Sequence, residues 1–155
     1  MLIVVFRTAD GLYGIDAKRV VEVVPRVDCR HIPHAPAFIS GLLRYRGRVV
    51  PVIDFRLLTG SGVSRDALST RVILSEFTAE DGSTRTVGLM AENVSHVVKV
   101  KDEDFIARAM SLDEAPYLGA IAQLDEGLVQ LVNASRLISP KLQGELYGSL
   151  TEPSG

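Results

Sequence analysis

The sequence contains no tryptophan and only one cysteine, Cys29, among its 155 residues. A lone cysteine excludes an internal disulfide and is typical of proteins from a reducing compartment. No basic segment followed by an apolar one opens the chain, so no secretory signal peptide is predicted. The apolar runs are far shorter than the roughly 18–20 residues that a membrane-spanning helix needs. We therefore expect a cytoplasmic protein with no direct insertion into a membrane.

An excess of charge of one sign is also missing. Lysines and arginines number 17 against 19 aspartates and glutamates, which gives a net charge of −2 without a block of like charges. A nucleic-acid partner would require a clustered basic face, so this class of partner is not expected. The composition, 46% hydrophobic and 23% charged, indicates an ordinary globular domain.

The motifs of common enzyme classes are absent as well. The sequence has no Gly-x-Ser-x-Gly, no Gly-x-Gly-x-x-Gly, no His-Glu-x-x-His and no phosphate-binding loop. We therefore predict a protein that is not an enzyme and that requires no cofactor. Cys29, His31 and His34 leave one alternative open, a small metal-binding or enzymatic domain. It is the weaker interpretation, because a structural zinc site needs a fourth ligand and nothing nearby lowers the pKa of the thiol.

Short segments with β propensity alternate with turn formers along the whole chain. Turns such as Asp81-Gly82-Ser83 and Asp125-Glu126-Gly127 separate them, and this spacing predicts hairpins. An all-β barrel architecture follows, and two small barrels would hide most strand edges. The predicted strands are Leu2–Thr8, Leu12–Ile15, Val20–Val24, Ile39–Tyr45, Val49–Asp54, Thr70–Phe77, Arg85–Met90, Val94–Val100, Tyr117–Ala122 and Leu128–Val132.

The clearest hairpin reverses at Gly47, which supplies the backbone freedom that a tight turn needs. Arg46 and Arg48 flank this reversal, where side chains are presented to solvent. Pro51 removes one backbone donor from the second strand of the hairpin, which predicts that this strand lies at a sheet edge or carries a bulge. A sheet edge is a place where another protein can dock.

Helical signals are few and short. Apolar residues become sparse after Pro140, which divides the chain into a domain of two subdomains over 1–140 and a partly disordered tail over 141–155. The tail contains three leucines spaced for one helical stripe, Leu142, Leu146 and Leu150, and its last few residues are expected to be disordered. Single helical turns are predicted at Asp16–Arg19, at Asp54–Leu58 with Asp54 as a cap, at Asp102–Phe105, and at Ala134–Ile138, which Asn133 caps and Pro140 stops.

Glu22 interrupts the apolar run Val20–Val24. On a regular strand Glu22 shares a face with Val20, while Val23 points the other way. Two interpretations are open. The segment is either a solvated strand face or a contact patch in which apolar neighbours surround one orienting charge.

The order and spacing of several motifs resemble the CheW-like domain family, whose members are adaptors that couple chemoreceptors to a histidine kinase. The resemblance covers about residues 2–138. The motifs that carry it are Tyr13-Gly14-Ile15-Asp16, Val20-Val21-Glu22-Val23, Ile32-Pro33, Arg46-Gly47, Val49-Val50-Pro51-Val52-Ile53-Asp54, Thr70-Arg71-Val72-Ile73, Val87-Gly88-Leu89 and Leu131-Val132-Asn133.

This resemblance implies two intertwined five-stranded, SH3-like β-barrels with a few helical turns and no active site. It also implies that the groove between the barrels holds the tip of a methyl-accepting chemoreceptor, while another surface binds the regulatory domain of a CheA-type histidine kinase in a receptor array. Carried over by position, the receptor-binding residues are Val20, Glu22, Val23 and Arg46, and the two charged residues are placed to form a pair. A barrel that binds a small ligand is a further alternative, although small barrels fill their interiors with side chains.

Arg44 and Tyr45 depart from the family pattern, because they stand where Asn and Leu commonly precede the Arg-Gly turn. The hydrogen bonds of that Asn amide are therefore lost here. With Ala115-Pro116-Tyr117-Leu118-Gly119, the segment Arg44–Gly47 resembles the adaptor of Wsp-type surface-sensing systems, whose kinase controls a diguanylate cyclase. A pathway with cyclic-di-GMP output is the corresponding expectation.

Overall fold

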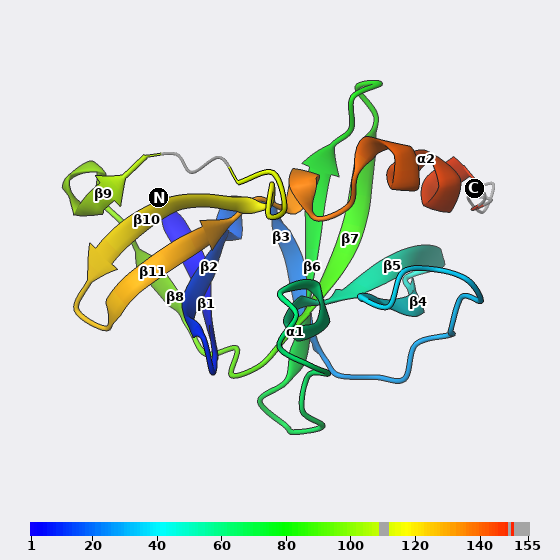
Figure 1. Cartoon of the computed structure of the whole chain (residues 1–155), viewed down its shortest axis with the longest axis horizontal. Helices are drawn as coiled ribbons and strands as arrows, with labels where there is room; N and C mark the ends of the chain where they lie inside the picture. Colours follow the sequence, from blue (N-terminus) through cyan, green and yellow to red (C-terminus); the bar gives the residue numbers. More distant parts are fainter. Residues whose placement is uncertain (109–111, 149, 151–155) are drawn as a thin grey trace.

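The structure of the protein, a computed structural model, describes residues 1–108, 112–148 and 150. Two β-sheets lie side by side, and a short C-terminal helix packs at one end of the second sheet (Figure 1). The first sheet has the order β8 (Val97–Lys99), β1 (Leu2–Thr8), β2 (Gly11–Asp16), β11 (Gly127–Val132), β10 (Leu118–Leu124) and β9 (Phe105–Ala107). The second has the order β3 (Val20–Pro25), β6 (Arg71–Thr78), β7 (Thr84–Ala91), β5 (Arg48–Asp54) and β4 (Ile39–Tyr45).

The first sheet takes its strands from both ends of the described chain, and the second uses only the middle. A parallel pairing of β2 with β11 joins the N-terminal hairpin to the C-terminal one. In the second sheet, a parallel pairing of β5 with β7 joins the β4–β5 hairpin to the β6–β7 hairpin. The predicted fold, all-β with two intertwined barrels, is thereby confirmed.

The first sheet has six strands instead of the expected five, because Phe105–Ala107 adds β9 at its edge. A three-residue strand is too short to show an alternating pattern, so the sequence did not predict it. The strand β8 is shorter than the predicted segment 94–100. The amide of Val94 donates to the carbonyl of Ser69, so the first end of the segment leaves the ladder. At the other end, Val100 and Met1 exchange backbone hydrogen bonds in the same register, although Val100 is not part of the strand.

Four aromatic rings occupy the centre of the apolar cluster between the two sheets. The ring centroid of Phe55 lies 5.1 Å from Phe6, 4.7 Å from Tyr13 and 6.2 Å from Tyr117, each in an edge-on arrangement. Such pairs contribute about 0.5–1.5 kcal/mol each beyond the area that they bury. Because Phe55 follows the second sheet while Phe6 and Tyr13 belong to the first, these rings fix the sheets relative to one another.

Each sheet also encloses an apolar interior of its own, as expected for small barrels filled by side chains. The interior of the first contains Ile3, Val5, Leu12, Val100, Ala122 and Val129. That of the second contains Val50, Val52, Val72, Leu74 and Met90. Filled interiors give no support to the small-ligand alternative.

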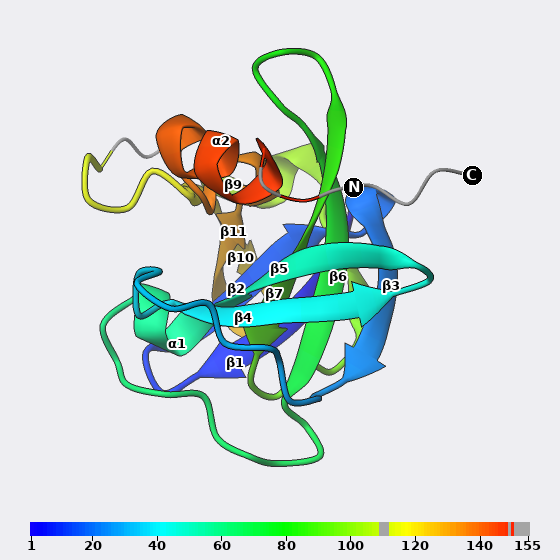
Figure 2. The same ribbon diagram turned by 90° about the vertical axis from the view of Figure 1, so that its right-hand side faces the viewer.

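The β4–β5 hairpin turns through Arg46 and Gly47, whose φ angles are 48° and 77°. Tyr45 pairs with Arg48, so the loop has two residues, and positive φ at both is the type I′ geometry that suits hairpins. Glycine adopts this conformation freely, whereas an arginine is held there at a cost of about 1–2 kcal/mol. Figure 2 shows the hairpin crossing in front of β6 with its turn beside β3.

The strand β5 is not an edge strand, so the prediction based on Pro51 was wrong. It lies between β4 and β7. Leu42, which pairs with Pro51, exchanges its backbone hydrogen bonds with Arg30 on the other side of β4. The missing N–H of Pro51 therefore points away from β4, and the pairing with β7 begins only at Val52. The proline interrupts no ladder bond, and the bulge lies in β4 instead.

The predicted helical turns are confirmed, each somewhat shorter than expected. They are the 3₁₀ turns Ala17–Arg19, Asp102–Asp104 and Ala134–Arg136 and the helix α1 (Phe55–Leu58). Asn133 and Asp54 act as the predicted side-chain caps. Pro140 starts the helix α2 (Pro140–Gly148), because proline is tolerated in a first helical turn, where its missing N–H is not needed.

The helix α2 ties the end of the chain to the second sheet. Leu142 and Leu146, two leucines of the predicted stripe, pack against the cluster between the sheets. The hydroxyl of Tyr147 donates to the carbonyl of Thr86 at 2.7 Å. The expected disorder of the last residues concerns 151–155, which lie outside the described residues. Among the described helices, none is long and apolar enough to cross a membrane.

We expect Gly41→Ala to destabilise the fold strongly. Gly41 has φ +144°, and a Cβ atom at this position would overlap the carbonyl oxygen of Arg30, which is bonded to Leu42. The combined backbone strain and overlap predict a loss of about 2–4 kcal/mol in the free energy of unfolding, measured by denaturant titration. Gly82→Ala is the matched control, with φ +85° and open space around the new methyl group. Equal losses in the two variants would contradict this account of Gly41.

Candidate functional site

The strand β3 forms an edge of the second sheet and carries Glu22. Its register with β6 shifts between Val20, opposite Ser75, and Glu22, opposite Leu74. This bulge lets Val20 and Val23 both pack against the cluster between the sheets. The prediction that Glu22 shares a face with Val20 was therefore wrong, since a bulge breaks the period of two. Beyond the bulge the register is regular, so Glu22 and Val23 face opposite ways as predicted.

Glu22 and Arg46 form the predicted pair. Arg46 Nη2 lies 3.4 Å from Glu22 Oε1, with the arginine side chain 72% and the glutamate side chain 40% exposed. The guanidinium of Arg46 also lies over the ring of Tyr45, 5.2 Å from its centroid. An ion pair this exposed contributes only about 0–1 kcal/mol to stability. Its effect is to orient the Arg46 guanidinium rather than to hold the fold.

Tyr45 anchors this pair to the interior of the second barrel. Its ring packs beside Leu43 and Val24 on the interior cluster. Its hydroxyl is enclosed and lies near the Glu22 carboxylate. Burial raises the pKa of the Tyr45 phenol, and the Glu22 carboxylate raises it further. The phenol stays neutral, and its ring serves as a platform for the arginine.

A cavity of about 420 Å³ lies between the two sheets. Leu131 lines it from the first sheet and Ser75 from the second, and Arg19 stands beside them. The Glu22–Arg46 pair does not line this cavity. Because Arg19 directly precedes Val20, the strand β3 leads from the cavity to the charged pair.

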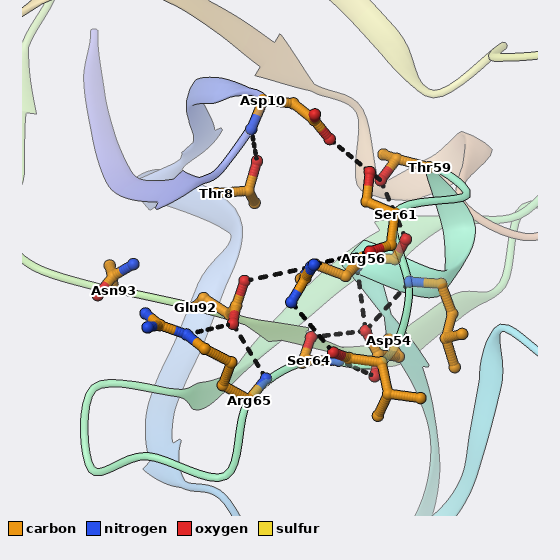
Figure 3. A network of polar contacts seen from close by, with 12 residues as sticks. Thr8, Asp10, Asp54, Arg56, Thr59, Ser61, Ser64, Arg65, Glu92 and Asn93 are labelled. Atoms are coloured by element: carbon orange, nitrogen blue, oxygen red, sulfur yellow. Dashed lines mark hydrogen bonds and ion pairs between the residues drawn. The ribbon is translucent and has the colours of Figure 1, made fainter.

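Asp54 is a buried carboxylate that organises the chain after β5 (Figure 3). One of its oxygens accepts hydrogen bonds from the amides of Arg56 and Leu57 and so caps α1. The same oxygen accepts a bond of 2.6 Å from the Ser64 hydroxyl, and the other accepts the Ser64 amide. Asp54 thus joins the end of the hairpin strand to the loop that follows α1.

Glu92 is a second buried carboxylate in the same network (Figure 3). One oxygen accepts both the amide and Nε of Arg65, at 3.0 and 2.9 Å, and the other lies 3.5 Å from Nε of Arg56. Arg56 in turn donates to the carbonyls of Ser61 and Val63. Sequence reasoning did not single out Glu92, although a charge directly after the buried strand β7 was a usable signal.

The structure does not assemble Cys29, His31 and His34 into a metal centre. Within the described ranges, no group of three ligating side chains comes close enough to hold an ion. Burial raises the pKa of the Cys29 thiol, which Arg26 only partly opposes. A thiol held in its neutral form is a poor nucleophile and a poor ligand. The geometry therefore gives the metal or enzyme alternative no support.

Comparison with known proteins identifies the family. The model of the CheW-like domain matches residues 2–141. The chain therefore belongs to the CheW-like domain family, as its motifs indicated.

Individual relatives agree with this assignment. The chemotaxis protein CheW of Klebsiella aerogenes is 32% identical over 139 residues, which cover 87% of this chain and 80% of that protein. The chemotaxis protein CheW of Rhizobium meliloti is 28% identical over 66% of this chain and 63% of its own length. The crystal structure of the scaffolding protein TtCheW from Thermoanaerobacter tengcongensis has a TM-score of 0.75 at 28% identity, covering 89% of this chain and 87% of that one.

We expect Glu92→Gln to destabilise the protein and to release the loop after α1. The amide keeps the size of the side chain but leaves two arginines without their buried counter-charge. The expected loss is roughly 2–4 kcal/mol in urea unfolding, somewhat below that for a fully buried pair because Arg65 is exposed. Exchange of the Arg65 amide hydrogen should accelerate as well. Glu80→Gln, at an exposed turn position, is the control, and a similar loss there would contradict a special role for Glu92.

Removing metal ions should leave the protein folded. Because three candidate ligands do not converge, we expect no stoichiometric zinc and no change in melting temperature when a chelator is added. The measurement is metal analysis of the purified protein together with thermal melts with and without EDTA. A large drop in melting temperature on chelation would overturn the interpretation of Cys29, His31 and His34 as ordinary polar residues.

Proposed function

We propose that the protein is a non-enzymatic adaptor that couples a methyl-accepting chemoreceptor to a CheA-type histidine kinase in a chemosensory array. The observation that carries this proposal is the CheW-like domain match over residues 2–141. The two-sheet fold shared with a protein described as a scaffold supports it. Such a protein acts by binding two partners at once, and it requires no cofactor and no reactive group. It is cytoplasmic and reaches the membrane only through the receptor.

The receptor tip binds, in this proposal, along β3 and the adjoining cavity between the sheets. Val20, Glu22, Val23 and Arg46 are the residues assigned to it. Val20 and Val23 are half-buried at the border of the sheet interface. Glu22 lies between them on β3 and pairs with Arg46 of the β4–β5 turn. An apolar border with a few orienting charges is the usual anatomy of a protein–protein contact.

The kinase partner is the regulatory domain of a CheA-type enzyme, on a surface separate from β3. A protein that catalyses no reaction can transmit a signal only by binding one conformation of a partner more tightly than another. We propose that the adaptor passes the state of the receptor to the kinase in this way. The aromatic packing around Phe55 supports this role, because it holds residues of the two barrels against one another.

The pathway that we propose is a surface-sensing one with cyclic-di-GMP output. Two segments carry this finer proposal, Arg44–Gly47 and Ala115–Gly119, which resemble the adaptor of Wsp-type systems. Deleting the gene and measuring cellular cyclic-di-GMP on surfaces and in liquid tests it. Swimming chemotaxis lost without a change in cyclic-di-GMP would contradict it.

Arg46→Glu should weaken receptor binding without unfolding the protein. The reversed charge would face Glu22, and losing a partly desolvated charged contact at an interface typically costs about 2–5 kcal/mol. Stability should change by less than about 1 kcal/mol, because the pair is exposed. The measurement is calorimetric titration of a soluble receptor cytoplasmic fragment, with thermal melts in parallel.

Two further variants sharpen this test. Arg46→Asn removes the charge but suits the positive φ at this position, so it should weaken binding while keeping or raising stability. Arg7→Glu, an exposed change on β1, should leave affinity unchanged. Unchanged affinity in Arg46→Glu would move the receptor surface elsewhere, and a collapsed melt would show that Arg46 is structural.

A further inference from the structure

The tip of the β4–β5 hairpin concentrates positive charge in a chain whose net charge is −2. Arg44, Arg46 and Arg48 surround the two-residue turn, with Tyr45 and Gly47 between them. Glu22 is the carboxylate that pairs with this group, through Arg46. Three positive charges against one negative charge leave a local excess of two at a single turn.

Arg44 and Arg48 are the free members of this group. Both are exposed, and neither side chain forms a hydrogen bond or an ion pair with any described residue. Arg48 lies opposite Tyr45 in the hairpin register, while Arg44 precedes Tyr45 by one residue. Because neighbouring residues on a strand face opposite ways, the two arginines project from the two faces of the hairpin, on either side of Arg46.

The backbone that carries these charges is held in place. The type I′ turn fixes the loop, and the ring of Tyr45 is anchored in the barrel interior with Arg46 stacked on it. Side chains presented by a fixed turn lose less conformational freedom on binding than those of a mobile loop. Clustered like charges on a surface add nothing to the core, so the structure alone offers no stabilising role for them.

We propose that Arg44 and Arg48 bind acidic side chains of the receptor. The receptor segment that contacts the hairpin tip then carries carboxylates that face these two arginines. The inference rests on the proposed function, because the receptor is the occupant assigned to the adjoining Glu22–Arg46 pair. The planar guanidinium fork binds carboxylates in a bidentate manner, which gives direction as well as charge. Two free arginines would make too few phosphate contacts for a nucleic acid.

Arg44 and Arg48 place two fixed positive charges on either side of the turn. A guanidinium can only donate hydrogen bonds, so it selects acceptors, and among side chains a carboxylate accepts most strongly. The hairpin tip therefore favours receptor segments that carry carboxylates over segments that lack them.

The test is a titration of the full chain with a soluble cytoplasmic fragment of a chemoreceptor from the same organism. The double variant Arg44→Glu/Arg48→Glu should bind about ten-fold or more weakly than the wild type, since like charges then face each other. Raising the salt from about 50 to about 500 mM should weaken binding of the wild type but not of the variant, because screening reduces the attraction in the first and the repulsion in the second. Neutralising the acidic residues at the tip of the fragment should weaken the wild type to a similar extent.

The matched control is Arg7→Glu/Arg136→Glu, which changes the net charge equally at exposed positions outside the hairpin. It should bind like the wild type, and thermal melts should show all variants folded. Equal binding by the hairpin variant and the wild type would overturn the inference while leaving the proposed function intact. Equal weakening in the control would overturn it too, by assigning the effect to net charge. A fragment that fails to bind the wild type at any salt concentration would overturn the proposed function itself.

Discussion

The contact of Phe55 with the rings of the first sheet is the interaction on which the arrangement of this protein depends. Neither sheet forms a complete globule alone, because the largest apolar cluster lies between them. Phe55 reaches that cluster because Asp54 caps the helical turn and so sets the direction of the chain after β5. A buried carboxylate and a buried ring, adjacent in sequence, thus link the hairpin strand to the interface between the sheets.

The same residues fix the surface proposed for the receptor. The strand β5 runs from the exposed turn at Arg46 to the buried cap at Asp54, so one end of the hairpin is anchored in the core while the other is presented to solvent. The ion pairs of Glu92 with Arg56 and Arg65 attach the loop after α1 to the same buried region. A hairpin turn held in one position suits an adaptor, because the positions of its exposed side chains determine which partner it binds.

Much of this fold was predictable because its signals are local. Alternating apolar residues and glycine turns gave most of the strands, and Asn133 and Asp54 marked helical turns through their own hydrogen bonds. The failures involve partners that are distant along the chain. The bulge at Val20–Glu22 appears only in the register with β6, and the place of Pro51 inside a sheet depends on how Arg30 pairs with β4.

The candidate site shows the same division between local and distant information. Glu22 and Arg46 were identifiable as unusual charges, and their pairing followed from the family pattern, but the platform that Tyr45 provides required the packed barrel. The energies indicate why this unit exists. The left-handed backbone of Arg46 costs about 1–2 kcal/mol, and an exposed pair returns at most about 1 kcal/mol. Stability therefore does not account for an arginine at this turn, which agrees with the proposal that a binding partner contacts its side chain.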